Sequence, residues 1–253
     1  MKIFLATNPY FLHILEEVNQ KYVLLSYLFL SKGNQDEVED KLRELQDSGV
    51  EVIIDSGAHT LQKGGEVNYE SFFSNYLIWL KRMQDYIYQY VELDIENIVG
   101  IEKVYEWTAK LEKELKQPPI KVWHRWRGVS LWEQMAKEND FIGFSGFLVN
   151  PGGGGEIPVN YIPLFLNIAK KYNCKVHGFG FTKPNLIMRF PFYSVDSTSW
   201  LMGGRYGNIY YFTGRKMTSR HRNVIAKNPS AEDLNNWNAL QWKKFSDFME
   251  MRT

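Results

Sequence analysis

The sequence contains very little cysteine, and its charges of opposite sign nearly cancel. Cys174 is the single cysteine among 253 residues, which excludes a disulfide framework and a zinc site built on several thiolates. Thirty Lys and Arg against 29 Asp and Glu give a net charge of +1. This balance excludes the whole-chain basic signature of many nucleic-acid-binding proteins. No uncharged run reaches the roughly 18 residues that a membrane span needs, so we expect no membrane association and a cytoplasmic location.

The composition is that of a globular protein, with 44% hydrophobic and 15% aromatic residues. Short runs rich in β-branched and aromatic residues predict strands. These runs cover residues 3–7, 22–29, 50–57, 86–94, 120–126, 141–147, 175–181 and 192–198. Apolar residues recurring every three or four positions predict helices between them. The helices are expected at 9–20, 35–47, 69–83, 101–115, 130–139, 160–172, 184–190 and 231–251.

This strict alternation of eight strands and eight helices favours a parallel sheet, and its length and count are typical of a (β/α)₈ TIM barrel. A doubly wound open sheet is the alternative, but NPYF stands where a Gly-rich phosphate fingerprint would follow the first strand. We therefore expect an α/β single domain over residues 1–253, with a basic loop and C-terminal helix at 197–253. A glycine run at 152–155 follows the sixth strand and is either a plain connection or a lid beside the site.

Polar residues gather where the predicted strands end, which is where barrel enzymes carry their active groups. Asp55, Asp94 and Asp196 each follow or close a strand, and His124 and His177 lie on neighbouring ones. Each aspartate has an alternative role as a helix cap or turn residue, and each histidine as a core residue. Two chemistries fit such clustered carboxylates: a metal site with oxygen and imidazole ligands, or glycosyl transfer, in which a carboxylate attacks or stabilises an oxocarbenium-like centre.

Several motifs resemble those of the tRNA-guanine transglycosylase (queuine tRNA-ribosyltransferase) family. Asp55-Ser56-Gly57 is similar to the start of that family's DSGGFQ motif, and Asp94 falls at its Phe-Asp-Glu segment. The remaining matches are Gly146-Phe147-Leu148-Val149 with the family's Gly-Gly-Leu-Ala-Val-Gly loop, His177-Gly178-Phe179-Gly180 with its Leu-Met-Gly-Val-Gly strand, Ser194-Val195-Asp196-Ser197 with its Met-Phe-Asp-Cys segment, and Arg205-Tyr206-Gly207-Asn208 with its Arg-Asn-Gly. Order and approximate spacing agree over most of the chain, and that family has a (β/α)₈ barrel.

The resemblance implies exchange of a guanine in a nucleic acid for a 7-deazaguanine such as preQ0 or preQ1. It assigns Asp196 as the nucleophile that carries the ribosyl intermediate and Asp55 as the group that handles protons on the base. Asp94 and the backbone of Gly146 would read the base edge. The other substrate-binding residues expected on this basis are Ser56, His124, His177 and Gly178. No metal and no cofactor are expected.

The chain departs from that family in lacking its Cys-x-Cys-x₂-Cys zinc site. It is similar to a short, zinc-less variant, of the kind found in phages and in DNA modification, where the location would be the host cytoplasm. The substrate is accordingly tRNA or DNA, and the oligomeric state stays open.

Residues 197–231 form a long stretch without Asp or Glu. Aromatic residues alternate there with cations, which suit phosphate contacts and base stacking. The predicted nucleic-acid-binding residues are Arg205, Arg215, Lys216, Arg220 and Arg222. The alternative for this stretch is a solvated surface. For the whole protein, two alternatives to base exchange stay open: a metal-dependent or glycosidic hydrolase of a small substrate, and a non-catalytic nucleic-acid-binding barrel.

Overall fold

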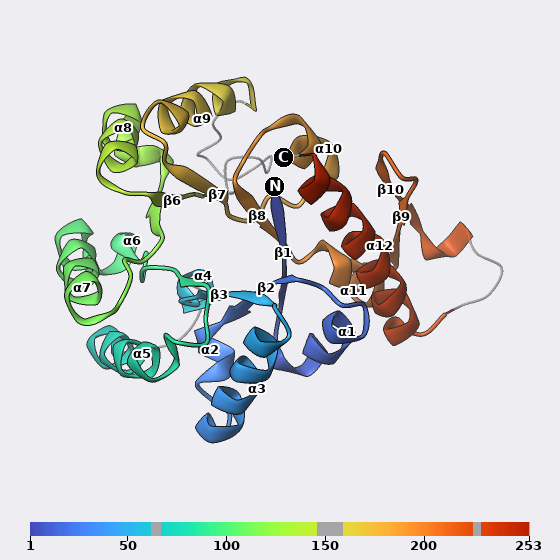
Figure 1. The fold of residues 1–253 in the computed structure, drawn as a ribbon, viewed down its shortest axis with the longest axis horizontal. Coiled ribbons are helices and arrows are strands. Elements are labelled where there is room, and N and C mark those ends of the chain that lie inside the picture. The colour runs from blue at the N-terminus through green and yellow to red at the C-terminus, as the bar shows by residue number, and fades with distance from the viewer. Residues whose placement is uncertain (62–66, 146–158, 225–228, 253) are drawn as a thin grey trace. The chain divides into compact units, whose positions relative to one another are not determined.

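The computed structural model describes residues 1–61, 67–145, 159–224 and 229–252. Within these residues, eight parallel strands alternate with helices along the chain (Figure 1). The strands are β1 (Lys2–Thr7), β2 (Tyr22–Ser26), β3 (Glu51–Asp55), β4 (Gln89–Tyr90), β5 (Lys121–Trp123), β6 (Phe141–Phe144), β7 (Lys175–Gly178) and β8 (Ser194–Ser197). The predicted (β/α)₈ class of α/β fold is confirmed.

The helices lie mostly where the apolar periodicity predicts them. They are α1 (Leu12–Glu17), α2 (Tyr27–Leu30), α3 (Gln35–Asp47), α4 (Ala58–Leu61), α5 (Tyr69–Met83), α6 (Glu96–Val99), α7 (Ile101–Glu114), α8 (Gly128–Glu138), α9 (Ile162–Lys171), α10 (Pro184–Arg189), α11 (Met202–Tyr206) and α12 (Ala231–Met251). None of the helices described is both long and apolar enough to cross a membrane.

The chain divides into two compact units. The first consists of Met1–Ala6, Tyr10–Gln20 and Trp123–Thr253, and the second of Thr7–Pro9 and Lys21–Val122. The prediction of a single domain stays a prediction.

The sheet of the first unit has the order β1-β8-β7-β6, with all neighbours parallel. Its strands are buried almost throughout, as expected for a parallel sheet with both faces covered. Beside this sheet the rings of Trp123, Trp132, Phe144 and Phe165 pack together, with centroids 4.8–5.6 Å apart. Such rings bury large apolar areas, so this cluster anchors β5, β6, α8 and α9 and fixes the strand ends that follow.

The sheet of the second unit has the order β2-β3-β4, with Leu24 opposite Ile53 and Ile54 opposite Tyr90. Two of the strand predictions here are wrong in extent. The apolar run at 22–29 turns helical at Tyr27, and the run at 86–94 contributes only Gln89–Tyr90 to the ladder. Both runs are buried for much of their length, and burial alone does not distinguish a strand from a short buried helix or irregular backbone.

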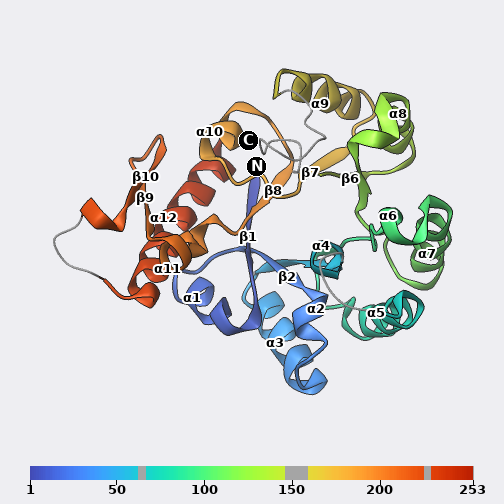
Figure 2. The same cartoon turned by 180° about the vertical axis from the view of Figure 1, so that it is seen from behind.

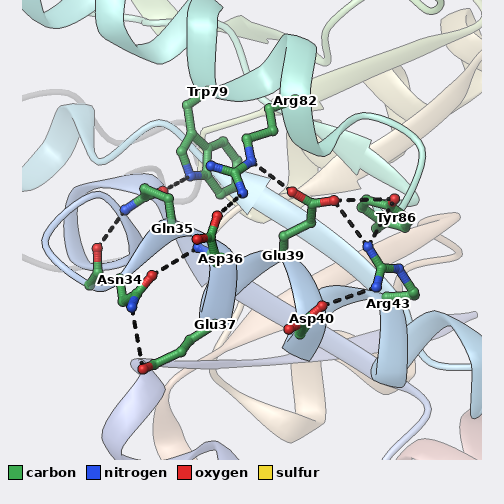
Figure 3. A network of polar contacts seen from close by, with 11 residues as sticks. Asn34, Gln35, Asp36, Glu37, Glu39, Asp40, Arg43, Trp79, Arg82 and Tyr86 are labelled. Carbon is green, nitrogen blue, oxygen red and sulfur yellow. Dashed lines mark hydrogen bonds and ion pairs between the residues drawn. The ribbon is translucent and has the colours of Figure 1, made fainter.

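Helices α3 and α5 of the second unit are joined by a surface network of ion pairs (Figure 3). Arg82 on α5 contacts Asp36 at 2.5 Å and Glu39 at 2.7 Å on α3. Arg43 contacts Glu39 and Asp40, both at 3.0 Å. Each cation of this network therefore has carboxylate partners within the unit.

The basic stretch of the first unit is not a loop, because it contains an antiparallel hairpin. Strands β9 (Asn208–Phe212) and β10 (Met217–His221) pair in register from Asn208↔His221 to Phe212↔Met217. Helix α12 lies along β9 in both views of the molecule (Figures 1 and 2). This helix begins at Ala231, as predicted, and the structure shows Ser230 as its N-cap with a capping box completed by Asp233.

Candidate functional site

Three polar side chains of strands β7 and β8 lie together in the first unit: His177, Ser194 and Asp196. His177 lies opposite Ser194 in the parallel register, and Asp196 follows Ser194 by two residues on the same face. The Nδ1 atom of His177 lies 2.8 Å from Ser194 Oγ, and its Nε2 lies 3.3 Å from Asp196 Oδ1. The structure therefore brings together two predicted site residues, His177 and Asp196, through a serine that the prediction did not include.

The roles of these groups follow from their hydrogen-bonding chemistry. An ionised carboxylate only accepts hydrogen bonds, so Nε2 of His177 carries the hydrogen that faces Asp196. In a neutral imidazole Nδ1 is then the acceptor, and the Ser194 hydroxyl donates to it. Ser194 is fully buried, so its hydroxyl sets the tautomer of His177 and does not reach a substrate.

A backbone group completes the anchoring of Asp196. Gly180 lies just beyond β7 with a φ of +65°, and its N–H donates to Oδ1 of Asp196 at 2.8 Å. Oδ1 thus accepts two hydrogen bonds, whereas Oδ2 accepts none from the described part of the chain. The Asp196 carboxylate is therefore held in place through Oδ1, and Oδ2 is left available to a ligand.

Burial separates the two members of this pair. The His177 side chain is 0% exposed, whereas 12% of the Asp196 side chain is exposed. Rings of Phe4, Phe141 and Phe179 surround the imidazole, with centroids 5.9, 6.5 and 4.4 Å away. His177 is therefore a positioning residue, and Asp196 is the member that can touch a ligand.

Gly178, another predicted site residue, is closely packed. A Cβ built there would lie 3.1 Å from Phe181 and 3.2 Å from Phe192. A larger residue would fit only if these rings gave way by a few tenths of an ångström. Gly178 thus supports the site by allowing close packing beneath it.

In the second unit, Asp55 and Ser56 form the turn from β3 into α4. Asp55 Oδ2 accepts the Gly57 N–H at 2.9 Å, and Ser56 Oγ accepts the Ala58 N–H at 3.4 Å. Gly57 has a φ of +86°, and a Cβ there would lie 2.7 Å from Leu28 Cβ, so only glycine fits. The Asp-Ser-Gly motif thus has a local structural role, the alternative that the sequence left open.

Asp55 and Asp94 nevertheless act on a common neighbour. The Tyr76 hydroxyl is fully buried and donates to Val91 O at 2.8 Å. Burial raises its pKa well above the usual value, and the charges of Asp55 and Asp94 raise it further. Both carboxylates are half-buried, and both lie near enough to Tyr76 for their charges to act on its hydroxyl.

Glu92, two residues before Asp94, is a structural carboxylate. It is 2% exposed, its Oε2 accepts from Thr108 Oγ1 at 2.7 Å and its Oε1 accepts from the Val122 N–H at 2.8 Å. Both oxygens are used to tie α7 and β5 to the end of β4. The sequence does not distinguish Glu92 from Asp94, because the partners of Glu92 lie 16 and 30 residues away.

His124 follows β5 and stacks on Trp126 in the short 3₁₀ turn Arg125–Arg127. The two ring centroids are 4.6 Å apart with planes 5° from parallel, and Trp126 is 61% exposed. Gly146 and the glycine run at 152–155 lie outside the described residues. Among the residues described, no group of three or more His, Cys, Asp or Glu side chains is arranged to hold a metal ion.

The five predicted nucleic-acid-binding cations are all exposed in the first unit. Arg205 lies on α11, Arg215 and Lys216 lie in the turn of the hairpin, Arg220 lies on β10, and Arg222 follows it. No carboxylate of the described residues forms an ion pair with any of them. Arg220 instead lies 6.0 Å from the Tyr211 ring centroid.

The comparisons with known proteins give limited likeness. No protein-family model and no curated protein matches the sequence. Among solved structures, the chain is similar to a 3-dehydroquinate dehydratase from Aquifex aeolicus VF5, at 15% identity and a TM-score of 0.47 over 78% of this chain and 88% of that one. It is also similar to a GH113 β-1,4-mannanase, at 15% identity and a TM-score of 0.43 over 72% of each chain.

Proposed function

We propose that this protein is a glycosyl-transfer enzyme in which Asp196 is the nucleophile, and that it exchanges a guanine in a nucleic acid for a 7-deazaguanine. The observation that carries the proposal is the asymmetric anchoring of Asp196. Two N–H donors hold Oδ1, and Oδ2 accepts no hydrogen bond from the described residues. A nucleophilic carboxylate needs one oxygen fixed for orientation and the other available for attack.

The partners of Asp196 also suit an anionic nucleophile. They are an imidazole nitrogen and a backbone amide, and no Lys or Arg of the described residues forms an ion pair with Asp196. The aromatic rings around His177 exclude water from the supporting side, which strengthens these hydrogen bonds.

The proposed reaction has two balanced steps. Oδ2 of Asp196 bonds to C1′ of the nucleotide as the C1′–N9 bond breaks, and guanine leaves with the electron pair and takes up a proton. The incoming base then loses a proton from N9, bonds to C1′ and displaces Asp196. The resemblance supplies the identity of the base, and the roles that it gives Asp55 and Asp94 stay predictions.

The test is incorporation of a labelled 7-deazaguanine into tRNA and into duplex DNA, run in parallel with Asp196→Asn. The amide keeps the size of the side chain but lacks the anionic oxygen, so incorporation and any covalent protein–nucleic-acid adduct should fall by about 10³-fold or more. Asp140→Asn, at an exposed position of the first unit, is the matched control and should keep full activity. Near-normal exchange by Asp196→Asn would refute the proposal.

The same assay separates the alternatives. Release of guanine without incorporation of a new base would identify a hydrolase. Nucleic-acid binding without either reaction, in the wild type, would identify a non-catalytic protein. Both outcomes would replace the proposed base exchange.

A second pair of variants tests the positioning role of Ser194. Ser194→Ala removes the donor to His177 Nδ1 and frees the imidazole to adopt the other tautomer, so kcat should fall about ten- to a hundredfold while KM stays nearly constant. Ser197→Ala is the control, since Ser197 is equally buried on β8 but accepts from the Ser199 N–H at 3.1 Å. Each change should cost about 1–2 kcal/mol of stability. Equal kcat in the two variants would remove Ser194 from the site.

A further inference from the structure

The β9–β10 hairpin is a rigid element that ends in a tight turn. Thr213 and Lys216 close the turn with a 2.9 Å backbone hydrogen bond, and Gly214 takes the positive φ of +85° that the turn requires. The Thr213 hydroxyl also bonds the Lys216 N–H and carbonyl, both at 3.1 Å. The cations at the tip, Arg215 and Lys216, are therefore carried on ordered backbone.

Helix α12 covers the outer edge of β9 with side chains in place of another strand. Asn238 accepts the Tyr210 N–H at 2.8 Å and donates to Asn208 O at 2.9 Å. Gln241 accepts the Phe212 N–H at 3.0 Å, and Trp237 Nε1 donates to Tyr210 O at 2.8 Å. One edge of β9 is thus held by α12 and the other by β10, which lies on the side away from the helix.

The chemistry of β10 is that of a polyanion-binding surface. From Thr218 to His221 every residue is exposed, and the hydroxyls of Thr218 and Ser219 are followed directly by the side chains of Arg220 and His221. Lys216 and Arg220 are four residues apart, about 14 Å along an extended strand, which spans about four phosphates at the axial spacing of one nucleic-acid strand. None of these cations forms an ion pair with a carboxylate of the described residues.

The aromatic residues of β9 pack against rings of α12 and are only partly exposed. Tyr210 packs on Trp242, Tyr211 on Trp237, and Phe212 on both Phe245 and Phe248. Single-stranded nucleic acid is generally bound by stacking its bases on exposed rings. The β9 rings offer unpaired bases only part of their surface, so the hairpin fits a duplex better, and stacking on bases stays a prediction.

The shape of the hairpin distinguishes the two kinds of duplex. A two-stranded ribbon fits the major groove of B-form DNA, which is about 12 Å wide. The major groove of A-form RNA is too deep and narrow for side chains to read. We propose that the β9–β10 hairpin is a docking element for duplex DNA, with β10 and the turn in the major groove and Arg215, Lys216 and Arg220 on the phosphates.

The docking serves the base exchange proposed above, and in this respect the inference rests on the proposed function. Its test measures binding alone and does not depend on catalysis. The full-length protein, without any free base, is titrated into labelled duplex DNA, duplex RNA of the same sequence and single-stranded DNA at several salt concentrations. Duplex DNA should bind most tightly. Duplex RNA binding equally well would overturn the assignment to the major groove.

The matched variants carry the same change in charge. Arg215→Ala, Lys216→Ala and Arg220→Ala together should lower the salt slope of log K by about two to three, because phosphate contacts are lost. Lys113→Ala, Lys137→Ala and Lys170→Ala together remove three exposed cations from α7, α8 and α9 and should leave the slope unchanged. Equal losses in the two triple variants would show a general charge effect and overturn the proposal.

A modified duplex tests the groove directly. The C5 position of pyrimidines faces the major groove, so bulky C5 substituents should weaken binding by about tenfold or more. Unchanged affinity would place the hairpin elsewhere on the duplex.

The proposed function and the proposed docking can fail separately. DNA binding by the hairpin without base exchange would refute only the proposed function. Base exchange that needs Asp196, together with an unaltered salt slope in the hairpin variant, would refute only the docking.

Discussion

Two charged surfaces of this protein differ in whether their cations have carboxylate partners. On the α3–α5 surface of the second unit, Arg82 and Arg43 are held by Asp36, Glu39 and Asp40 (Figure 3). On the β9–β10 hairpin of the first unit, the cations have no carboxylate partner among the described residues. The first surface uses its charges to join two helices, and the second leaves them available to an external anion.

The difference extends to how each surface is ordered. The α3–α5 network is ordered by its own ion pairs, which are exposed and individually weak. The backbone of β9 is held by neutral amide side chains of α12, and the hairpin cations form no ion pair within the described residues that would hold it in place. Binding charges can therefore be removed from the hairpin without unfolding it, which makes the comparison open to experiment.

The largest effect should come from the amides that hold the hairpin. Asn238 is 0% exposed, and Asn238→Ala removes two hydrogen bonds and leaves the Tyr210 N–H without its partner. We expect a loss of about 2–4 kcal/mol in urea unfolding, together with weaker DNA binding. Asn236→Ala is the control, since Asn236 Oδ1 accepts no hydrogen bond from the residues that the structure describes, and it should cost less than about 0.5 kcal/mol. Similar losses in both variants would mean that the amides do not clamp the hairpin.

A smaller effect should separate an arginine of each surface. Arg82→Gln breaks two ion pairs and should lower the unfolding temperature slightly at low salt, with the loss disappearing at high salt. Arg220→Gln should leave stability within about 0.5 kcal/mol at any salt concentration, because no ion pair is lost. Thermal unfolding at two ionic strengths measures both. A salt-dependent loss in Arg220→Gln would show that this arginine has an internal partner after all.

The smallest effect should appear in how the free energy of unfolding falls with pH in the acidic range. The hydrogen bond from Arg82 lowers the pKa of Glu39 below its usual value, with the charges of Arg82 and Arg43 acting in the same direction. The unfolded chain therefore takes up this proton first, so the stabilisation is present above a pH of about 4.3 and is lost as the pH falls through the folded pKa. Glu39→Gln should flatten the loss of stability in this range, whereas Arg220→Gln should follow the wild type. If the stability of Glu39→Gln, measured by unfolding at several acidic pH values, fell as in the wild type, the network would not act on this carboxyl.

The helices were predictable because their signals are local. The ranges 35–47, 69–83 and 231–251 agree with α3, α5 and α12 to the residue, and Asn34, Asn68 and Ser230 cap them. The hairpin was not predicted, since β10 lacks the alternation of apolar and polar residues that marks a half-buried strand. Its position depends on α12, whose contributing amides lie about 30 residues away along the chain.

In the candidate site, too, the residues with a local sequence signal were predictable and those that depend on distant contacts were not. Asp196 and His177 were predictable from their places at strand ends, which the eightfold alternation sets. Ser194 and Gly180 were missed, because their roles arise from the register between β7 and β8 and from one backbone conformation. The Gly-Phe-Gly that follows His177 was the available signal for Gly180, since a glycine after a strand often marks backbone that must face a neighbouring group.

The two edges of the hairpin have different consequences for the behaviour of the protein in solution. The edge of β9 is closed by the α12 amides, so another chain cannot add a strand there. The outer edge of β10 pairs with no strand in the described part of the chain, and exposed edges of this kind promote self-association unless charged residues prevent it. The cations of β10 therefore also keep copies of the protein apart, and variants that neutralise them are best purified at low concentration and checked for aggregation by light scattering.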